Sequence, residues 1–334
     1  MNNVYIMSAN RSAIGGFGGS LKNHCPVDLG TLVAKEAIAR SGFETNEVEH
    51  AVFGNVIHTE PRDMYVSRVI ALQAGMDKAS AALTVNRLCG SGLQAIVSAS
   101  QIIMLGDASV AMAGGVEVMS NGAHIVQGFR WGSRMGDGQV HDMMLGALHD
   151  PFGHGHMGIT AENISSRYQI SREMQDEFAL TSQKRAKEAI EKGLFKEQIT
   201  PIEIKSRKGI NIFDTDEHPK YDTTIESLSN LKTVFKNNGS VTPGNASGIN
   251  DGASALVLAN EKQAIKGKPI AKIISYGFGG VEPDEMGLGP IPASKMALKK
   301  VGLSIDDLDL VESNEAFAAQ ACAVNKELGL DQNI

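Results

Sequence analysis

Short apolar runs rich in β-branched residues alternate with amphipathic segments along the first third of the chain, and this alternation restricts the fold class. A first strand is predicted at Val4–Ser8. The helix after it begins at Asp28, a good N-cap residue, and ends at Gly42, which suits the left-handed position after a helix. Further strands are predicted near residues 51–56, 82–86 and 110–114, with helices near 65–74 and 90–105 between them. Strands separated by helices predict an α/β fold with a mainly parallel sheet.

The alternation stops between about Glu117 and Gly248 and then resumes. The middle segment is rich in Gly, His and Met, with helices predicted at 159–168 and 172–192, and we expect an inserted subdomain that lies over a site. The resumed pattern resembles a second copy of the first, with strands at 255–259, 270–276 and 308–312 and helices at 293–301 and 316–328. This copy contains fewer strands than the first before Ile334, so we expect an incomplete second half.

Charge and cysteine content argue against several classes of protein. Acidic residues outnumber basic ones by 38 to 31, and the formal net charge of −7 argues against a nucleic-acid-binding protein. The three cysteines, Cys25, Cys89 and Cys322, are widely spaced without a CxxC pair, which fits a reducing setting. The N-terminus lacks the features of a signal peptide, and no apolar stretch approaches the roughly 20 residues of a membrane span. We therefore expect a soluble cytoplasmic protein that binds no membrane.

The sharpest local feature is residues 86–95, Asn-Arg-Leu-Cys-Gly-Ser-Gly-Leu-Gln-Ala, where a predicted strand passes through a Gly-Ser-Gly turn into a helix. A thiol at a helix N-terminus meets the positive end of the helix dipole and free backbone amides, which favour the thiolate. Cys89 is therefore a candidate nucleophile. The alternative is a small buried apolar residue, and the residues alone leave both interpretations open.

Residues 153–158 satisfy the literal G-x-G-x-x-G pattern of dinucleotide binders. They follow Pro151 rather than a strand, so we expect a loop and no dinucleotide site. His149, His154 and His156 are close in sequence, but their spacing matches no ordinary zinc site. Because loop histidines bind substrate or water more often than metal, we expect no metal here.

Two further segments combine small and amide side chains. Residues 244–253, Gly-Asn-Ala-Ser-Gly-Ile-Asn-Asp-Gly-Ala, suit either a structural turn or hydrogen bonds to a polar ligand. Asn314 follows the predicted strand at 308–312, so it lies either at the carboxyl edge of a sheet, where α/β sites are found, or at a helix cap. Composition leaves both pairs of alternatives open.

Taken together, these segments resemble the thiolase family over essentially the whole chain. The resemblance rests on motifs in the family's order, at residues 11–15, 86–95, 114–120, 156–163, 244–253, 289–293 and 314–320. Residues 54–65 and 143–152 are most similar to β-ketothiolases that make short 3-oxoacyl-CoA esters. The resemblance implies an α/β thiolase fold with two duplicated halves, mixed sheets between helices, and an inserted loop domain that covers coenzyme A and takes part in oligomerisation. The implied domains are residues 1–118 with 249–268, the loop domain 119–248, and an incomplete second half at 269–334.

The resemblance also implies a reversible Claisen condensation of two acyl-CoA esters to a short 3-oxoacyl-CoA such as acetoacetyl-CoA. Cys89 accepts the acyl group as a thioester, its backbone amide contributes to an oxyanion hole, and Asn314 holds a water that polarises the carbonyl of the second acetyl-CoA. CoA esters are then substrates, no metal or further cofactor is needed, and the assembly is a homodimer or homotetramer. The implied CoA-binding residues are Leu148, His156, Met157, Lys220, Ser227, Leu231, Phe235, Ser247, Met286, Ala316 and Phe317.

Some positions depart from the family pattern. Lys220 stands where relatives often carry an Arg, so the charge is kept but the planar guanidinium is lost. Thiolases also carry a Gly-His-Pro loop that activates the nucleophile and a Cys-x-Gly loop that deprotonates the second acetyl-CoA. Neither motif occurs in these 334 residues, and Cys322 matches a helical stretch instead.

Two alternatives to an active thiolase follow. We expect either a part of a longer enzyme or a shortened product, and the second case leads to a non-catalytic chain that only binds CoA or associates as a subunit. A decarboxylating condensing enzyme of the same fold is the other alternative. The Cys-Gly-Ser-Gly and Asn-Glu-Ala-Phe sequences favour thiolase over it.

Overall fold

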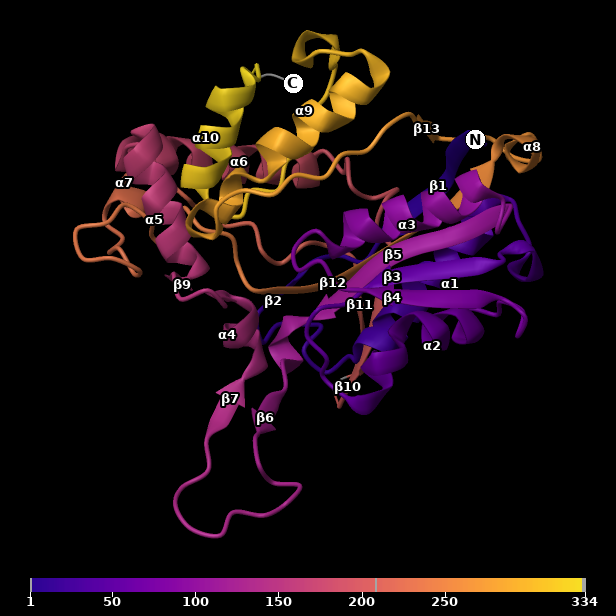
Figure 1. Cartoon of the computed structure of the whole chain (residues 1–334), viewed down its shortest axis with the longest axis horizontal. Helices are drawn as coiled ribbons and strands as arrows, with labels where there is room; N and C mark the ends of the chain where they lie inside the picture. The colour runs from indigo at the N-terminus through magenta and orange to yellow at the C-terminus, as the bar shows by residue number, and fades with distance from the viewer. Residues whose placement is uncertain (1, 208, 332–334) are drawn as a thin grey trace. The chain divides into compact units, whose positions relative to one another are not determined.

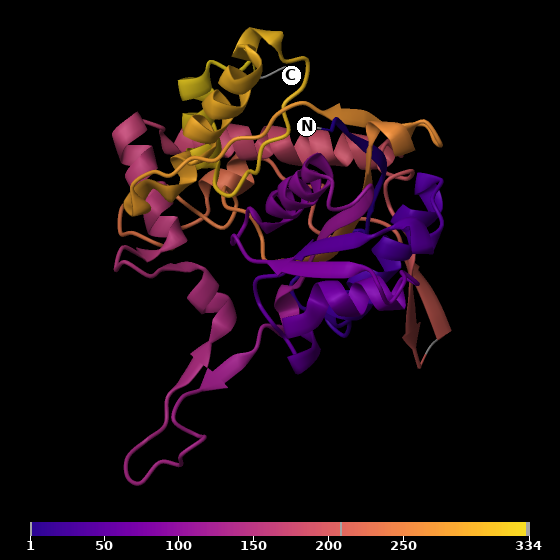
Figure 2. The same cartoon turned by 45° about the vertical axis from the view of Figure 1, so that its right-hand side comes forward.

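A computed structural model describes residues 2–207 and 209–331, and the chain divides into two compact units. Unit 1 consists of Met1–Ala147, Gly193–His218 and Ile249–Ile273. Unit 2 consists of Leu148–Lys192, Pro219–Gly248 and Ile274–Ile334. Figures 1 and 2 show the elements of both units from two directions.

A seven-stranded mixed sheet forms the centre of unit 1. Its strands are β1 (Val4–Arg11), β2 (Gly15–Gly16), β3 (His50–Gly54), β4 (Ala81–Val85), β5 (Val110–Val118), β12 (Asn250–Asn260) and β13 (Ala271–Ile273). They follow the order β13-β1-β12-β5-β3-β4, and β2 pairs with β12. β3 is parallel to β4 and β5, whereas β12 is antiparallel to β1 and β5. The prediction of a mainly parallel sheet is wrong here, because β12 follows a long excursion of the chain instead of a short crossover helix.

Helices cover both faces of this sheet. The helices of unit 1 are α1 (Pro26–Ser41), α2 (Val66–Gln73), α3 (Ser91–Leu105), α4 (Met143–Ala147) and α8 (Glu261–Ala264). Met112 of β5 belongs to a buried cluster with Val33 of α1 and Ile70 of α2. Its neighbour Ala111 belongs to a second cluster with Ile103 of α3, so α3 lies on the opposite face (Figure 1). Alternate strand residues therefore reach two separate cores, which explains the continuous apolar runs in the sequence.

The first helix begins two residues before the predicted N-cap. Pro26 is the first residue of α1, and Cys25 is its N-cap in an extended conformation. Proline is preorganised for this position and lacks the amide hydrogen that would be unsatisfied there. Asp28 therefore lies inside the first turn, where its charge still favours the helix dipole. The predicted end is confirmed, since Gly42 follows the helix with a φ of 80°.

One stretch of unit 1 is apolar enough, by length and composition, to cross a membrane. It is Leu88–Leu105, which is 18 residues long, so the expectation that no apolar stretch approaches the length of a membrane span is wrong. Residues 91–105 of this stretch form α3, which packs on the sheet of unit 1 with Ala95, Ala99 and Ile103 fully buried. Only 28% of the stretch is buried, and the criterion rests on length and composition alone.

Two hairpins also belong to unit 1. They are formed by β6 (His124–Val126) with β7 (Val140–Asp142) and by β10 (Ile202–Ser206) with β11 (Gly209–Phe213). The β6–β7 hairpin extends away from the sheet (Figure 2). In the loop between its strands, the side chains of Phe129, Trp131 and Met135 are 75%, 88% and 94% exposed.

Unit 2 is mainly helical. Its elements are β8 (His149–Asp150), β9 (Gly155–His156), α5 (Met157–Tyr168), α6 (Arg172–Glu191), α7 (Ile225–Ser229), the 3-10 helix η4 (Pro283–Leu288), α9 (Pro290–Val301), the 3-10 helix η5 (Ile305–Asp307) and α10 (Ala318–Leu328). Ile164 and Ile170 pack with Leu288 and Ala323 in a buried core. The four helices predicted for α5, α6, α9 and α10 are confirmed to within a few residues at their ends.

The strand predicted at residues 308–312 is not formed, since these residues adopt no helix or strand. A short strand is stable only when its amide and carbonyl groups pair with a neighbour. Within the described residues 274–331 there is no strand with which it can pair. The strand predicted at 270–276 is confirmed in part as β13, which belongs to the sheet of unit 1.

The compact units divide the chain at different places from the predicted domains. Of the predicted loop domain 119–248, residues 119–147 and 193–218 belong to unit 1, and the remainder belongs to unit 2. The three-domain division, with an incomplete second half, stays a prediction.

Candidate functional site

Cys89 lies in the turn that joins β4 to α3, directly before Gly90, the N-cap of the helix. The turn is closed by Ser91, whose hydroxyl accepts a hydrogen bond from the N–H of Arg87 at 2.8 Å and donates one to the carbonyl of Leu88 at 2.7 Å. The predicted strand, turn and helix around Cys89 are therefore confirmed. The backbone amide of Cys89 precedes the first helical turn, where amides have no acceptor within the helix.

The turn is tight, and its neighbours fix its position. Leu88 adopts a φ of 47°, a conformation that costs a residue with a side chain about 1–2 kcal/mol. The side chain of Asn86 accepts a hydrogen bond from the Leu88 N–H at 3.0 Å. In β3, a Cβ on Gly54 would lie 2.7 Å from the Cβ of Ser91. Only glycine at position 54 lets the turn approach the sheet this closely.

The side chain of Cys89 is exposed and its thiol is free, so the alternative of a buried apolar residue is wrong. Cys25 and Cys322 are partly buried. Burial, the largest cause, raises the pKa of each of these two thiols to about 11. At neutral pH both are therefore almost entirely protonated and unreactive.

All the predicted CoA-binding residues lie in unit 2, whereas Cys89 belongs to unit 1. In unit 2, aromatic rings from separate segments meet. His156 stacks on Phe235, with ring centroids 4.7 Å apart and 19° between the planes. Phe235 contacts Phe317 edge to face at 6.2 Å, and His149 contacts His156 in the same way at 5.2 Å. The structure therefore brings together three residues that the sequence analysis assigned to the CoA site.

His156 is held as a neutral imidazole of defined orientation. It is the N-cap of α5, and its Nδ1 accepts a hydrogen bond from the N–H of Gly158 at 3.0 Å. In the neutral ring the proton is then on Nε2, which is a donor. Burial, followed by the nearby His149, lowers the pKa of His156 below its ordinary value. At pH 7 this side chain therefore offers a hydrogen-bond donor without a positive charge.

The segment that carries Ser247 runs beside the segment that follows Asn314. The N–H of Ser247 donates to the carbonyl of Ala316 at 3.0 Å, and the N–H of Ala318 donates to the carbonyl of Asn245 at 2.9 Å. These two bonds flank an antiparallel bridge between residues 246 and 317. For residues 244–253, the structure thus shows a paired, defined backbone.

Asn314 is exposed and lies in the irregular stretch before this pairing. It does not cap α10, because Phe317 is the N-cap of that helix. The helix-cap alternative is therefore wrong, and so is the expectation that Asn314 directly follows a strand.

The remaining predicted CoA-binding residues differ in how firmly they are held. The N–H of Met157 donates to the carbonyl of Leu148 at 2.8 Å. Leu231 packs so closely on Gly244 that a Cβ there would lie 2.5 Å from its Cδ1. Met286 is in η4 and partly buried.

Lys220 and Ser227 are exposed. The backbone N–H of Lys220 donates to the side chain of Gln183 on α6 at 2.8 Å. The hydroxyl of Ser227 is engaged in a capping box with Thr224 at the start of α7. The backbone of Lys220 is therefore held against α6, and the hydroxyl of Ser227 is occupied by hydrogen bonds to the backbone of Thr224 at the start of α7.

A partly buried carboxylate near the end of β5, that of Glu117, was not predicted from the sequence. Glu117 accepts hydrogen bonds from the backbone N–H groups of Val56 and Ile57 at 3.0 and 2.9 Å, and from the side chain of Asn55 at 3.0 Å. Burial is the largest of the causes that together raise the pKa of Glu117 to about 7. Glu117 therefore fixes the start of the segment 54–65. Only its position among the apolar residues of β5 signals it in the sequence.

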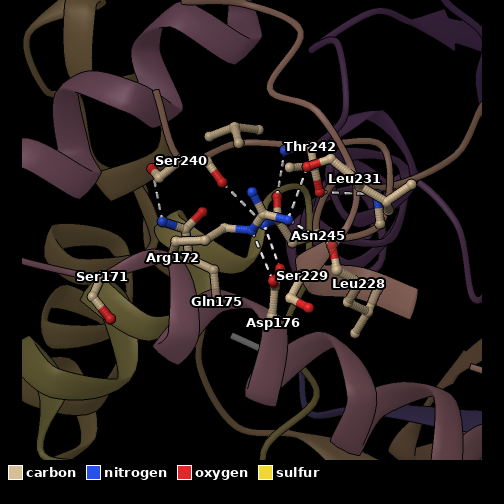
Figure 3. A network of polar contacts seen from close by, with 12 residues as sticks. Ser171, Arg172, Gln175, Asp176, Leu228, Ser229, Leu231, Ser240, Thr242 and Asn245 are labelled. Carbon is tan, nitrogen blue, oxygen red and sulfur yellow. Dashed lines mark hydrogen bonds and ion pairs between the residues drawn. The ribbon is translucent and has the colours of Figure 1, made fainter. Parts of the chain in front are cut away.

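A second missed feature is a polar network in unit 2 centred on Arg172, Asp176 and Asn245 (Figure 3). Arg172 and Asp176 are four residues apart on α6, a spacing that signals a helical ion pair. Asn245 lies far away in sequence, so no local pattern joins it to that pair.

Among residues 2–207 and 209–331, no group of three or more His, Cys, Asp or Glu side chains is placed to hold a metal ion. The G-x-G-x-x-G stretch at 153–158 runs from a turn through β9 into the start of α5. It follows the two-residue strand β8, which pairs only with β9 and is not part of a parallel sheet, so it lacks the context of a dinucleotide-binding fingerprint.

A cavity of about 780 Å³ lies in unit 2 between α6, α10 and the stretch at 311–315. Its lining includes Ser182, Arg185, Glu312, Glu315 and Cys322, and no residue predicted to bind CoA. It is therefore distinct from the aromatic cluster around His156.

Comparison with known proteins identifies the family. The chain matches the family model "Thiolase, N-terminal domain" over residues 4–262 and "Thiolase, C-terminal domain" over residues 267–334. It is 56% identical to the beta-ketothiolase BktB of Cupriavidus necator over 331 residues, which cover 98% of this chain and 84% of the relative. It is 48% identical to an acetyl-CoA acetyltransferase of Syntrophomonas wolfei, with coverage of 98% and 83%.

Solved structures agree with this. The acetyl-CoA acetyltransferase of Bacillus anthracis matches with a TM-score of 0.97 at 47% identity, covering 100% of this chain and 85% of that one. Human mitochondrial 3-ketoacyl-CoA thiolase, in complex with CoA, matches with a TM-score of 0.95 at 40% identity, covering 99% and 83%. This chain belongs to the thiolase family and has the thiolase fold. It is an acyltransferase.

Proposed function

We propose that this chain catalyses the reversible condensation of two acyl-CoA esters to a short 3-oxoacyl-CoA, such as acetoacetyl-CoA, through a thioester on Cys89. The observation that carries the proposal is the 56% identity to a beta-ketothiolase over nearly the whole chain. The exposed thiol in a tight turn at a helix N-terminus supports the same assignment.

In the first step, the thiolate of Cys89 attacks the carbonyl carbon of an acyl-CoA. The carbonyl oxygen becomes an oxyanion, which the N–H of Cys89 stabilises, and collapse of this intermediate expels the CoA thiolate, which takes up a proton. The product is an acyl-cysteine. Dividing the exchange into two transfers lowers the barrier of each.

In the second step, a second acetyl-CoA loses a proton from its methyl carbon to solvent, which balances the proton that the CoA thiolate took up in the first step. The resulting carbanion attacks the acyl-cysteine carbonyl and forms the new carbon–carbon bond. Asn314 holds a water that polarises the carbonyl of the incoming acetyl-CoA, and the sulfur of Cys89 leaves as a thiolate. Asn314 is exposed and lies outside any helix or strand, so its side-chain amide is not needed to cap a regular element. The side-chain donors and acceptor therefore suit this role.

CoA binds to unit 2 in this proposal. The aromatic cluster offers apolar surface, and neutral His156 offers a donor to the amide-containing pantetheine arm. A similar thiolase structure that contains CoA supports CoA as the ligand. CoA esters are substrates, and we propose neither a metal nor a further cofactor.

We also propose that the chain forms a homodimer or homotetramer in the cytoplasm. The loop of the β6–β7 hairpin carries Phe129, Trp131 and Met135, all largely exposed. Large apolar side chains grouped in this way mark interaction surfaces. A second copy of the chain is the expected occupant.

The test is the intact mass of the protein before and after incubation with acetyl-CoA. We expect the mass of the wild-type protein to increase by one acetyl group, and we expect no increase in Cys89→Ser. We also expect the wild-type protein to cleave acetoacetyl-CoA when CoA is added. The matched control is Cys25→Ser, which should keep the adduct. Protein that binds CoA and reacts with iodoacetamide at Cys89 but forms no acetyl adduct would support the non-catalytic alternative. Malonyl-CoA dependence of product formation would support a decarboxylating condensing enzyme.

A further inference from the structure

Residues 240–247 form no helix or strand, yet they carry Ser247, and side chains from α5 and α6 hold them in place. The carboxylate of Glu162 on α5 accepts the N–H of Ser240 at 2.9 Å and the N–H of Val241 at 2.8 Å. A Cβ on Gly239 would lie 2.2 Å from this carboxylate. One end of the segment is therefore anchored to α5.

The other end is anchored through Asn245, which is 3% exposed. Its side-chain oxygen accepts the N–H of Thr242 at 2.8 Å. Its side-chain nitrogen donates to the carboxylate of Asp176 at 2.9 Å and to the carbonyl of Ser240 at 3.1 Å. Both polar atoms of the side chain are used, so the amide has one orientation only.

Asp176 on α6 is 2% exposed and connects this amide to a cation. Its other oxygen accepts a hydrogen bond from Nε of Arg172 at 2.7 Å. Arg172 in turn donates to the carbonyls of Leu228 and Leu231 at 2.6 and 3.1 Å, at the end of α7. Figure 3 shows the guanidinium between Asp176 and the Leu228–Leu231 turn. A buried carboxylate costs free energy unless it is paired, and here the two oxygens of Asp176 pair with Arg172 and Asn245. The relative positions of these three side chains are therefore closely defined.

The backbone at Asn245 also pairs with the segment that follows Asn314. Its carbonyl accepts the N–H of Ala318, and two residues later the N–H of Ser247 donates to the carbonyl of Ala316. Any rotation or shift at Asn245 therefore moves Ser247 and changes the register with the segment of Asn314.

We propose that Asp176 is a positioning residue that, through the amide of Asn245, sets the register between the Ser247 segment and the Asn314 segment for CoA binding and acyl transfer. The inference rests on the proposed function and deepens it. Asp176 touches neither substrate nor reacting atoms in this proposal. It acts by orienting one side chain, and Arg172 supplies the charge that makes the carboxylate stable there.

The test compares Asp176→Asn with wild type. The amide has the same shape but presents a donor toward either Asn245 or Arg172, so one hydrogen bond in the chain is lost. A buried hydrogen bond to a charged group contributes enough that we expect the Kd of CoA, by calorimetry, and the KM of acetyl-CoA to rise about fivefold or more. Labelling of Cys89 by iodoacetamide is expected to be unchanged, because Cys89 belongs to unit 1.

Ile164→Val is the matched control, since it removes one buried carbon from the core of unit 2 without touching the network. It is expected to lower Tm while leaving the Kd of CoA within about twofold of wild type. Glu162→Gln is a second variant, which weakens the anchor at Ser240 and is expected to raise the Kd in the same direction, in case Asp176→Asn does not fold.

Three outcomes overturn the inference. The first is an unchanged Kd and KM in whichever of Asp176→Asn and Glu162→Gln folds. The second is an equal rise in Ile164→Val, because the effect is then general loosening of unit 2. The third is a wild-type protein that binds no CoA, which also overturns the proposed function. A wild type that binds CoA with an unchanged variant leaves the proposed function intact and overturns only the positioning role.

Discussion

Replacing Gly158 with alanine tests whether the stack of His156 on Phe235 contributes to CoA binding. A Cβ at position 158 would lie 2.3 Å from the Phe235 ring. Ordinary carbon contacts begin at about 3.5 Å, so the ring must move by about 1 Å or more. This displacement disrupts a stack whose centroids are 4.7 Å apart.

The expected magnitude follows from two opposing effects. Alanine favours a helix over glycine by about 1 kcal/mol, while overpacking costs about 1–3 kcal/mol, so Tm should fall only slightly. If the CoA site depends on the ring pair, loss of the pair weakens the binding free energy of CoA by about 0.5–1.5 kcal/mol. That difference corresponds to an increase of about two- to tenfold in the Kd of CoA.

Calorimetric titration with CoA measures this Kd directly. Gly146→Ala is the matched control, because Gly146 is also in a helix and a Cβ there meets nothing within 4 Å. The control should bind CoA like wild type. A Gly158→Ala protein with wild-type affinity would refute the role of the stack, and equal weakening in both variants would attribute the loss to glycine replacement in general.

Three further predictions concern other parts of the chain. At pH 8, iodoacetamide should modify Cys89 alone, because the pKa values of Cys25 and Cys322 are raised to about 11; peptide mapping that finds equal labelling of all three would contradict this. Burial raises the pKa of Glu117 from 4.5 to about 7, so the folded state binds this proton more tightly than the unfolded state does. The resulting contribution to the free energy of unfolding is complete below about pH 4.5 and is lost as the pH rises through about 7. The decline, on the order of 3 kcal/mol, should appear in denaturant unfolding of wild type and be absent in Glu117→Gln, and an identical pH profile in both proteins counts against it. Trp131→Asp should reduce the assembly mass measured by light scattering, since it places a charge in the exposed hairpin loop; an unchanged mass would exclude this loop from the interface.

Local chemistry in the sequence was sufficient for the elements that hold Cys89. A β-branched run, the Gly-Ser-Gly turn and the apolar helix after it are each decided within a few residues, and β4, the turn and α3 have the predicted form. The start of α1 shows the limit of the same reasoning. Both Pro26 and Asp28 are good helix-start residues, and the fold uses the proline.

Features that depend on distant partners were not predictable in this way. The strand expected at 308–312 has suitable residues, but a strand also needs a neighbour, and none is present within the described residues 274–331. The direction of β12 depends on the path of the chain before it and not on its own residues. The hydrogen bond between Asp176 and Asn245 joins α6 to a loop far along the chain. Nothing in the sequence around either residue indicates that the other is its partner.

The position of β12 in the sheet determines when unit 1 can fold during synthesis. β12 lies between β1 and β5, and Val4 pairs with Asn260 at one end of the ladder. Until the ribosome has released residue 260, both neighbours have unpaired edges, which are templates for association with other chains. Strands that are as far apart in sequence as β1 and β12 also pair slowly. Nascent chains that already contain β1, β3, β4 and β5 are therefore expected to need protection by chaperones until β12 emerges and completes the sheet.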